Sequence, residues 1–207
     1  MQSRSEGPEQ PTPPPGLFTV GHSNRDLDEF IDLLRAHRIS SVVDVRKLPG
    51  SSRYPHFNAD ALASSLKAHG ISFTRIESLS GRRPVDASVP FEVNAWWQNR
   101  SFHNYADHAL SREFRAGLST LLARSTHGRV AIMCAEAVWW RCHRRIIADH
   151  AIAAGTPVAH IMSEHSCPEA ELSSGAVLHE DGSITYPLAT SDGTGGKENQ
   201  RDSVVEH

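Results

Sequence analysis

The stretch GRVAIMC, residues 128–134, decides the fold class. After Arg129 it is apolar without alternation, which is typical of a strand that is buried on both faces. Such strands occur almost only in parallel sheets that helices cover on both sides. CHRRIIADHAIAAG, residues 142–155, follows with helical spacing of apolar residues, and PVAHIM, residues 157–162, follows as a further short apolar run. This part of the chain therefore predicts a strand, a helix and a strand in succession.

The same alternation extends toward the N-terminus. Apolar periodicity predicts strands and helices in turn, with strands at 17–23, 40–46 and 71–77 and helices at 25–39, 58–70 and 102–125. Asp181-Gly182, between alternating residues at 178–187, predicts a β-hairpin. We therefore expect an α/β fold: a single open, mostly parallel sheet with helices on both faces, a Rossmann-like three-layer arrangement, plus a C-terminal β-hairpin.

The two ends of the chain differ in composition from the middle. Residues 1–16 are rich in Pro, Gln, Glu and Ser, and residues 189–207 are similarly polar, so we expect both to be disordered tails. Residues 17–188 would then form one α/β domain. No apolar run reaches the roughly 20 residues of a membrane span, and residues 1–16 lack the apolar region of a secretory signal. Three cysteines, an odd and low number, favour reduced thiols and a cytoplasmic location.

Polar and titratable side chains follow the ends of several predicted strands. His22 and Ser23 follow the first strand, and Asp44 and Arg46 end the second. Further along lie Ser52, Arg53, Cys134, Glu136, Cys142, His143 and Arg144. Because ligands of open α/β sheets bind beyond the carboxyl ends of the strands, we expect these side chains to surround a common crevice.

The residue types suggest two groups of roles in that crevice. Acid–base or nucleophilic candidates are Asp44, Glu136, His22, Cys134, Cys142 and His143. Anion-binding candidates are Ser23, Arg46, Ser52, Arg53, Arg82 and Arg144. Asp44 and Arg46 are two positions apart on a strand and share a face, so a purely structural pairing of the two stays open. RKLPGSSR, residues 46–53, lacks the phosphate-loop spacing, and no dinucleotide fingerprint is present, so no cofactor is predicted.

The two cysteines near the crevice leave three roles open. Cys134 or Cys142 could be a nucleophile with His143 as its base. Both could instead be small buried apolar residues. A zinc site of Cys134, Cys142 and His143 is disfavoured, because an eight-residue gap separates the cysteines and a fourth ligand is missing. We therefore predict no metal.

Two tryptophan pairs and one irregular segment border the predicted crevice. Trp139 and Trp140 are either core or pocket wall, and Trp96 and Trp97 are either core or a stacking surface for a planar ligand. Residues 80–100 have the length and composition of a lid or specificity loop, and Arg82 and Arg83 would add positive charge if this loop covers the crevice.

Five ordered blocks resemble a known family. They are TVGHSNRDLDEFIDLL, VVDVRKLPGSSRYPHF, LSGRR, YADH and CAEAVWWRCHRRIIADH, between about Thr19 and Ile161. The chain is similar over this range to the bacterial and archaeal domain of unknown function 488. LSGRR departs from the family's usual Leu-Gly-Gly-Arg because Ser80 replaces a glycine. The resemblance implies a single α/β domain and implies no settled activity.

These observations favour an enzyme that acts on a nucleotide, a nucleoside or a nucleic-acid base, as a glycosidic-bond hydrolase or transferase with Asp44 and Glu136 as acid and base. A net charge of −3 suits a small phosphorylated or nucleobase ligand better than long DNA, although a local nucleic-acid footprint stays open. The alternatives are a thiol-dependent transferase or hydrolase, and a non-catalytic module that binds a phosphorylated ligand or nucleic acid. No membrane partner and no particular oligomeric state is predicted.

Overall fold

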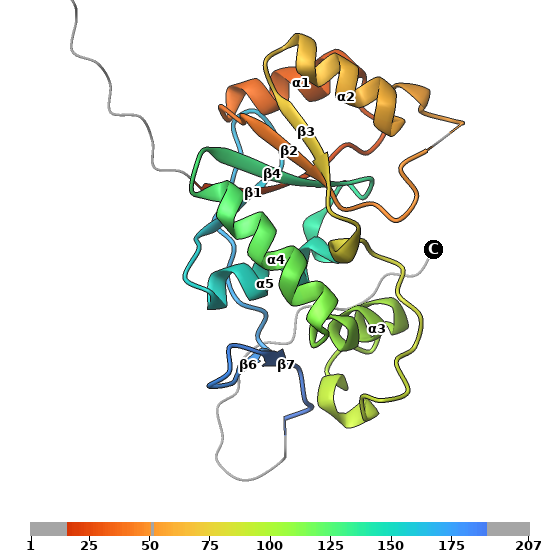
Figure 1. Ribbon diagram of the computed structural model, residues 1–207, viewed down its shortest axis with the longest axis vertical. Helices are drawn as coiled ribbons and strands as arrows, with labels where there is room; N and C mark the ends of the chain where they lie inside the picture. Colours follow the sequence, from red (N-terminus) through yellow and green to blue (C-terminus); the bar gives the residue numbers. More distant parts are fainter. Residues whose placement is uncertain (1–15, 51, 190–207) are drawn as a thin grey trace, which may run out of the picture.

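The structure is a computed structural model that describes residues 16–50 and 52–189 (Figure 1). The predicted disordered tails, 1–16 and 189–207, lie outside the described residues except for Gly16 and Ala189. Gly16 belongs to the first strand, so the strand begins one residue earlier than the sequence predicts.

Five parallel strands form the central sheet, as the sequence predicts. The strands are β1 (Gly16–Gly21), β2 (Ser41–Asp44), β3 (Ser72–Arg75), β4 (Arg129–Cys134) and β5 (Val158–Ile161). Their order in the sheet is β3-β2-β4-β1-β5, and every neighbouring pair is parallel. Gly21 pairs with Cys134, and Asp44 pairs with Met133. The ends of β1, β2 and β4 therefore meet at one edge of the sheet.

α-Helices cover both faces of the sheet (Figure 1). α1 (Leu27–Ala36) and α2 (Ala59–Ala68) lie on one face, and α3 (Arg100–Ala109), α4 (Arg112–Ser125) and α5 (Arg144–Ala153) lie on the other. The chain moves outward from β1 to β2 and β3, and then returns to insert β4 between β2 and β1. With right-handed crossovers, this reversal places the later helices on the opposite face.

Strand β4 shows why the fold class was predictable from the sequence. Ala131 and Met133 of β4 belong to the core beneath α1 and α2, whereas Val130 and Ile132 belong to the core beneath α4 and α5. All four side chains are fully buried or nearly so. Continuous apolar character thus reflects a strand with a core on each side.

The helix predicted over 102–125 is wrong in one respect, because two helices occupy this range. α3 ends at Ala109 and α4 begins at Arg112. Ser111 separates them, and its Oγ accepts a hydrogen bond from the Phe114 backbone N at 3.1 Å. This hydrogen bond makes Ser111 the N-cap of α4, so that α4 begins as a helix separate from α3.

The C-terminal hairpin is confirmed. β6 (Val177–Leu178) and β7 (Ile184–Thr185) pair antiparallel, and Gly182 adopts the positive φ of 78° that the turn requires. Beyond the hairpin, the hydroxyl of buried Tyr186 donates to Asp149 Oδ2 on α5 at 2.8 Å. Short 3-10 helices complete the described elements: η1 (Pro55–Phe57), η2 (Glu77–Leu79), η3 (Phe91–Asn94) and η4 (Trp139–Arg141).

Buried histidines predict loss of stability in acid. Burial lowers the pKa of His150, on α5, from 6.5 to about 4, and its Nε2 has no hydrogen-bond partner within the described residues. The unfolded chain therefore binds this proton first, so stability is complete above pH 6.5 and is lost as the pH falls toward 4. We expect His150 to contribute about 2 kcal/mol of destabilisation between pH about 7.5 and about 5.

Urea denaturation at several pH values measures this effect. The free energy of unfolding of His150→Leu should fall less steeply with decreasing pH than that of the parent protein. Equal slopes for the two proteins would show that His150 does not resist protonation in the folded state.

Candidate active site

Two adjoining pockets lie at the carboxyl ends of the strands. The first, here the Cys142 pocket, has a volume of about 290 Å³ and includes Cys134, Cys142 and His143 in its lining. The second, here the His22 pocket, has a volume of about 480 Å³ and includes His22 and Ser23. Both pockets share the lining residues Arg46, Leu48, Arg82, Ala135 and Glu136. The two pockets thus lie at the edge of the sheet where the strand-end rule predicts a crevice.

A buried chain of polar contacts supports the floor of the crevice. The Arg46 guanidinium donates from Nε to Asp44 Oδ1 at 2.9 Å and from Nη2 to Asp44 Oδ2 at 2.8 Å. The backbone N of Arg46 also donates to Asp44 Oδ1. Asp44 lines neither pocket, since its carboxylate lies beneath Arg46. The pairing that the sequence left open is present, and it makes Asp44 a residue that positions Arg46.

His22 extends this chain to the His22 pocket. Arg46 Nη1 lies 3.2 Å from His22 Nε2, and His22 Nδ1 lies 2.9 Å from the Ser23 carbonyl oxygen. Because a carbonyl and a guanidinium fix the two partners, Nδ1 donates and Nε2 accepts. Burial, followed by the charge of Arg46, lowers the pKa of His22 to about 4. His22 is therefore neutral near pH 7, and its ring stacks on Phe57 at 4.1 Å.

The Cys142 pocket contains an oriented cysteine–histidine pair. Cys142 Sγ lies 3.5 Å from His143 Nδ1. His143 Nε2 donates to the Val45 carbonyl oxygen at 3.0 Å, which leaves Nδ1 to face the sulfur. The ring also contacts the Tyr105 ring, with centroids 4.8 Å apart. Val45, the residue that follows β2, and helix α3 thus hold His143 in one orientation.

Cys134 and Arg144 complete the surroundings of the Cys142 sulfur. Burial raises the pKa of the Cys142 thiol, but a hydrogen bond with Cys134 and the nearby His143 and Arg144 outweigh it, so that the pKa lies well below its usual value. The same hydrogen bond, with burial, raises the pKa of Cys134. Arg144 is 1% exposed and donates from Nε to Cys142 Sγ at 3.3 Å. Within the described residues Arg144 forms no ion pair with a carboxylate, which favours an anionic sulfur next to it.

The sulfur and nitrogen atoms of this cluster are close enough to hold a metal ion. Cys134 Sγ, Cys142 Sγ and one ring nitrogen of His143 all lie within 4.8 Å of one another. The eight-residue gap between the cysteines is thus closed by the fold, because β4 ends at Cys134 and the loop returns at Cys142.

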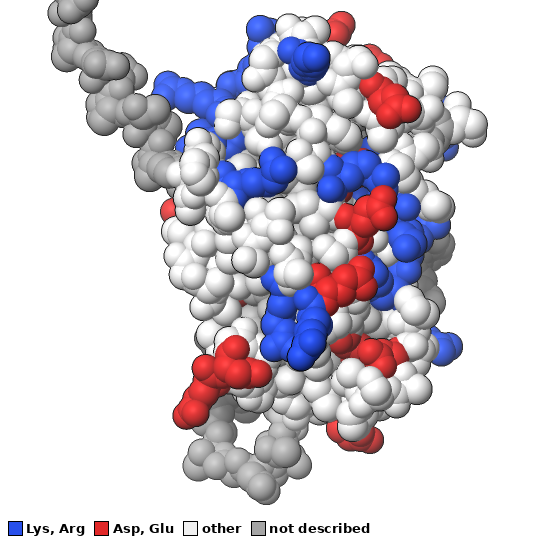
Figure 2. All heavy atoms as spheres, viewed as in Figure 1, with Lys and Arg blue, Asp and Glu red and all other residues white. Residues whose placement is uncertain are grey.

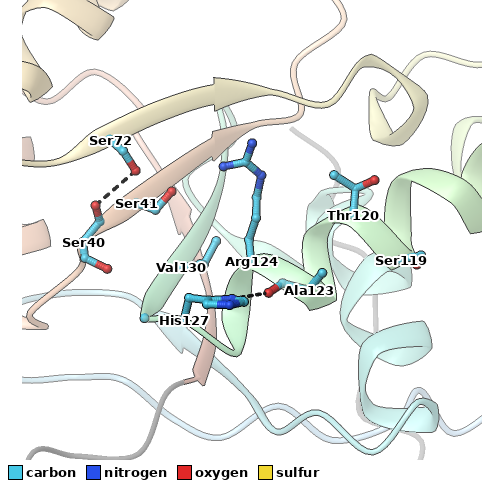
Figure 3. A pocket seen from close by; sticks show the side chains of 10 residues that line it. Ser40, Ser41, Ser72, Ser119, Thr120, Ala123, Arg124, His127 and Val130 are labelled. Atoms are coloured by element: carbon cyan, nitrogen blue, oxygen red, sulfur yellow. Dashed lines mark hydrogen bonds between the residues drawn. The ribbon is translucent and has the colours of Figure 1, made fainter.

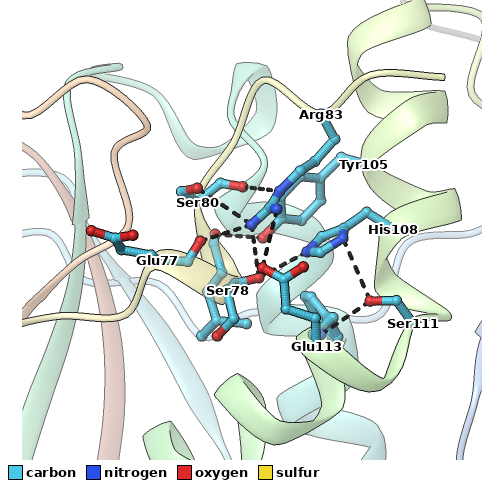
Figure 4. A network of polar contacts seen from close by, with 10 residues as sticks. Glu77, Ser78, Ser80, Arg83, Tyr105, His108, Ser111 and Glu113 are labelled. Atoms are coloured by element: carbon cyan, nitrogen blue, oxygen red, sulfur yellow. Dashed lines mark hydrogen bonds and ion pairs between the residues drawn. The ribbon is translucent and has the colours of Figure 1, made fainter. Parts of the chain in front are cut away.

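The loop that follows β3 is fastened to the helical layer by Arg83 (Figure 4). The Arg83 guanidinium donates to the carbonyl oxygens of Glu77, Ser78 and Ser80 and pairs with Glu113 of α4 at 3.3 Å. Arg83 is therefore structural rather than part of the crevice.

The two neighbours of Arg83 explain how the loop reaches the crevice. Ser80 has a φ of −71°, so the serine that replaces the family's glycine needs no left-handed conformation. Arg82 has a φ of 54°, which turns the chain at this point, and its side chain lines both pockets. Within the described residues Arg82 makes no hydrogen bond or ion pair, so its charge is available to a ligand.

The other anion-binding candidates do not all reach the crevice. Ser23 lines the His22 pocket. Ser52 and Arg53 are exposed and line neither pocket, and Arg53 instead lies over the Tyr54 ring at 5.4 Å. Ser51 lies outside the described residues. The predicted anion loop therefore contributes through Arg46 rather than through Arg53.

Several lining residues were missed by sequence reasoning. Lys47 and Arg141 add two cations to the Cys142 pocket, and Phe102 gives it an aromatic wall. Lys47 and Arg141 lie inside the two sequence blocks that carry most of the candidate site residues. This position is the signal by which the sequence could have identified them. Phe102 lies in the first turn of α3, outside both blocks, and no neighbouring sequence feature marks it as a lining residue.

Trp96, Trp97 and Trp139 serve packing in this structure, whereas Trp140 is 46% exposed. Trp97 is 7% exposed and stacks on Phe102, and Trp96 contacts Tyr186. Trp139 stacks on His160 at 4.1 Å. None of the four tryptophans lines either pocket of the crevice.

A further pocket of about 750 Å³ lies at the amino ends of the strands, away from the crevice (Figure 3). Its lining is mainly serine, threonine and alanine, with Arg124 as a lone cation beside His127. It has no carboxylate or thiol in its lining, whereas Cys134, Cys142 and Glu136 line the crevice at the opposite edge of the sheet.

Charges of both signs are interspersed on the face shown in Figure 2, which agrees with the net charge of −3. Within the described residues no helix is both long and apolar enough for a membrane span.

A three-layer α/β domain with a cationic, thiol-containing crevice is the class that fold and site define. Comparison with family models matches residues 26–151 to the family described as Domain of unknown function DUF488, and the chain belongs to this family. No curated protein matches significantly, and no solved structure does.

Proposed function

We propose that this protein is a cytoplasmic enzyme that binds a small phosphorylated ligand of nucleotide type in the Cys142 pocket and hydrolyses or transfers a group of it. One observation carries the proposal: four cationic side chains and a single carboxylate line this pocket, namely Arg46, Lys47, Arg82 and Arg141 with Glu136. Arginine donors suit phosphate oxygens through paired hydrogen bonds.

The remaining lining favours a ligand with a planar part. Phe102 offers an aromatic surface in the same pocket, and its ring is backed by Trp97 at a centroid distance of 4.9 Å. A nucleobase can stack on such a supported ring. The pocket volume of about 290 Å³ lies at the lower end of the range for small-ligand sites, and the adjoining His22 pocket extends it.

Glu136 is the acid–base candidate in this proposal. Its carboxylate forms no ion pair with any described residue, whereas the carboxylate of Asp44 is fully engaged by Arg46. A mechanism with two free carboxylates, which the sequence favours, is therefore less well supported than one in which Glu136 alone exchanges a proton with the ligand. Asp44 would act by holding Arg46 under the bound anion.

A binding experiment tests the anion site. We expect nucleoside monophosphates to raise the melting temperature of the protein, and we expect Arg82→Ala to weaken their affinity about tenfold to a hundredfold, since a charged hydrogen-bond donor is lost. Because Arg82 has no protein partner among the described residues, the fold of this variant should be unchanged.

Arg53→Ala is the matched control, since Arg53 is an exposed arginine that lines neither pocket. Inorganic phosphate and unphosphorylated nucleosides, tested alongside, separate recognition of the phosphate from recognition of the base. If Arg53→Ala weakens binding as much as Arg82→Ala does, the cationic lining of the Cys142 pocket is not the anion site.

Catalysis is tested with the ligands that bind. Glu136→Gln should abolish product formation while leaving the dissociation constant within a few-fold of the parent value. Binding without product in the parent protein would instead identify a non-catalytic binding module.

A second candidate function is a thiol-dependent transferase or hydrolase. The favouring observation is the Cys142 Sγ to His143 Nδ1 distance of 3.5 Å, with the ring oriented by the Val45 carbonyl. In that case Cys142→Ser, rather than Glu136→Gln, would remove turnover while binding persists.

A further inference from the structure

Two thiols and an imidazole converge on one wall of the Cys142 pocket. Cys134 ends β4, Cys142 follows the short helix η4, and His143 lies at the start of α5. Their ligand atoms lie within 4.8 Å of one another, and all three residues line the pocket.

The separations between these ligand atoms suit a tetrahedral metal ion. Zinc with a thiolate and an imidazole at its usual bond lengths places the sulfur and the nitrogen about 3.6 Å apart. Cys142 Sγ and His143 Nδ1 are 3.5 Å apart, and the sulfurs of Cys134 and Cys142 are close enough to share a hydrogen bond. Little movement is therefore needed to place one ion between the three atoms.

The surroundings hold these atoms as metal ligands are usually held. His143 donates its Nε2 hydrogen to the Val45 carbonyl, which directs the Nδ1 lone pair toward the sulfurs. Arg144 donates to Cys142 Sγ at 3.3 Å, which stabilises a thiolate there. A Cβ added to Gly81 would lie 2.8 Å from His143 Nδ1, so the absence of a side chain at Gly81 leaves room beside this nitrogen.

We propose that Cys134, Cys142 and His143 bind a zinc ion through their two Sγ atoms and Nδ1, with the fourth coordination position open to the Cys142 pocket. Two cysteines and one histidine with an open fourth position are a known ligand set of catalytic zinc. The missing fourth protein ligand, which argued against zinc at the level of the sequence, is then the position for water or substrate.

A bound zinc ion explains the presence of both cysteines better than a nucleophilic thiol does. A nucleophile needs one sulfur that a substrate can reach, but Cys142 is only 4% exposed and a second sulfur hydrogen-bonds to it. A bound metal ion uses both sulfurs and needs no direct access of the substrate to either.

The zinc site stands on ligand geometry alone, while its part in chemistry rests on the proposed function. Zinc lowers the pKa of a bound water and so supplies a hydroxide near neutral pH. Glu136 lines the same pocket and is the described carboxylate available there to exchange a proton.

The test begins with the metal content of the full chain. The protein is produced without a histidine tag, purified without chelators and analysed by inductively coupled plasma mass spectrometry, with about one zinc per chain expected. Cobalt(II) is then exchanged into the site. We expect a thiolate-to-cobalt charge-transfer band in the near ultraviolet and the strong visible bands of tetrahedral cobalt.

Single-ligand variants identify the site. Cys134→Ser, Cys142→Ser and His143→Gln should each weaken zinc at least about a hundredfold in competition with a chromophoric chelator, and each cysteine change should reduce the charge-transfer band. Cys167→Ser is the matched control, because Cys167 is a free cysteine outside the cluster and should leave both readings unchanged. Circular dichroism checks that each variant is folded.

Two results would overturn the proposal. One is a parent protein that takes up neither zinc nor tetrahedral cobalt when either is supplied. The other is a cobalt band that Cys134→Ser and Cys142→Ser leave at full strength. Nucleotide-dependent stabilisation of the metal-free protein is measured in parallel, so that a failed zinc site and a failed anion site give different results.

Discussion

Asp44→Asn should destabilise the folded protein by about 3–5 kcal/mol, since it removes one partner of a buried ion pair. The Asp44 side chain is 0% exposed and that of Arg46 is 5% exposed. Asparagine keeps the shape of aspartate but leaves the guanidinium of Arg46, whose side chain is almost entirely buried, without a counter-charge. Urea denaturation followed by circular dichroism measures the loss.

A second variant distinguishes the effect of losing the ion pair from the effect of leaving the Arg46 charge unpaired. Asp44→Asn combined with Arg46→Met removes both charges, and the double variant should recover at least about half of the lost stability. If the double variant is instead less stable than Asp44→Asn by a further similar amount, the cost does not come from the unpaired arginine.

Arg75 and Glu77 provide the matched control for this pair. They too are two positions apart and form an ion pair, at 3.2 Å, but their side chains are 29% and 77% exposed. Glu77→Gln should change the free energy of unfolding by less than about 1 kcal/mol, because an exposed pair is already solvated. Equal effects of Asp44→Asn and Glu77→Gln would contradict the assignment of Asp44 as the support of Arg46.

The order of the elements was predictable from the sequence because each element has one clear pattern of apolar residues. β4 is apolar throughout since both of its faces are covered, and α1 shows a buried stripe of Phe30, Ile31, Leu33 and Leu34. The single error of type, one helix for α3 and α4, came from Ser111. A serine is tolerated inside a helix and also favoured at its N-terminus, so the local signal was ambiguous.

The location of the crevice was also predictable, because the ends of parallel strands meet at one edge. This rule found His22, Cys134 and Glu136, all of which line the crevice. The roles of individual residues were not predictable. Arg82 and Arg83 are neighbours in sequence, yet Arg82 lines the pockets while Arg83 fastens the loop to α4. The turn of the backbone at Arg82, where φ is 54°, decides which of the two guanidiniums lines the crevice.

Gly21→Ala should have an equally large effect, because β1 touches the loop that carries Glu136. A Cβ at position 21 would lie 2.0 Å from the Glu136 carbonyl oxygen and 2.8 Å from that of Ala137. The loop has little freedom to retreat, since the backbone N of His22 donates to the Cys134 carbonyl at 3.0 Å. We expect a loss of about 3 kcal/mol or more in the free energy of unfolding, as for a severe overpacking of backbone.

The same substitution should also damage ligand binding, which distinguishes it from an ordinary packing defect. The Glu136 carbonyl oxygen that a new methyl group would displace also accepts from Arg144 Nη2 at 2.6 Å, and Arg144 in turn donates to Cys142 Sγ. Displacement of this loop therefore disturbs Glu136 and the Cys142 sulfur together.

Gly50→Ala is the matched control, because its Cβ would meet only Asn58 Oδ1 at 3.8 Å, although Gly50 also lines the crevice. For Gly50→Ala, the free energy of unfolding should change by less than about 0.5 kcal/mol, and the nucleotide-dependent thermal shift should stay close to that of the parent protein. If Gly21→Ala has an equally small effect, the loop accommodates the added methyl group without cost.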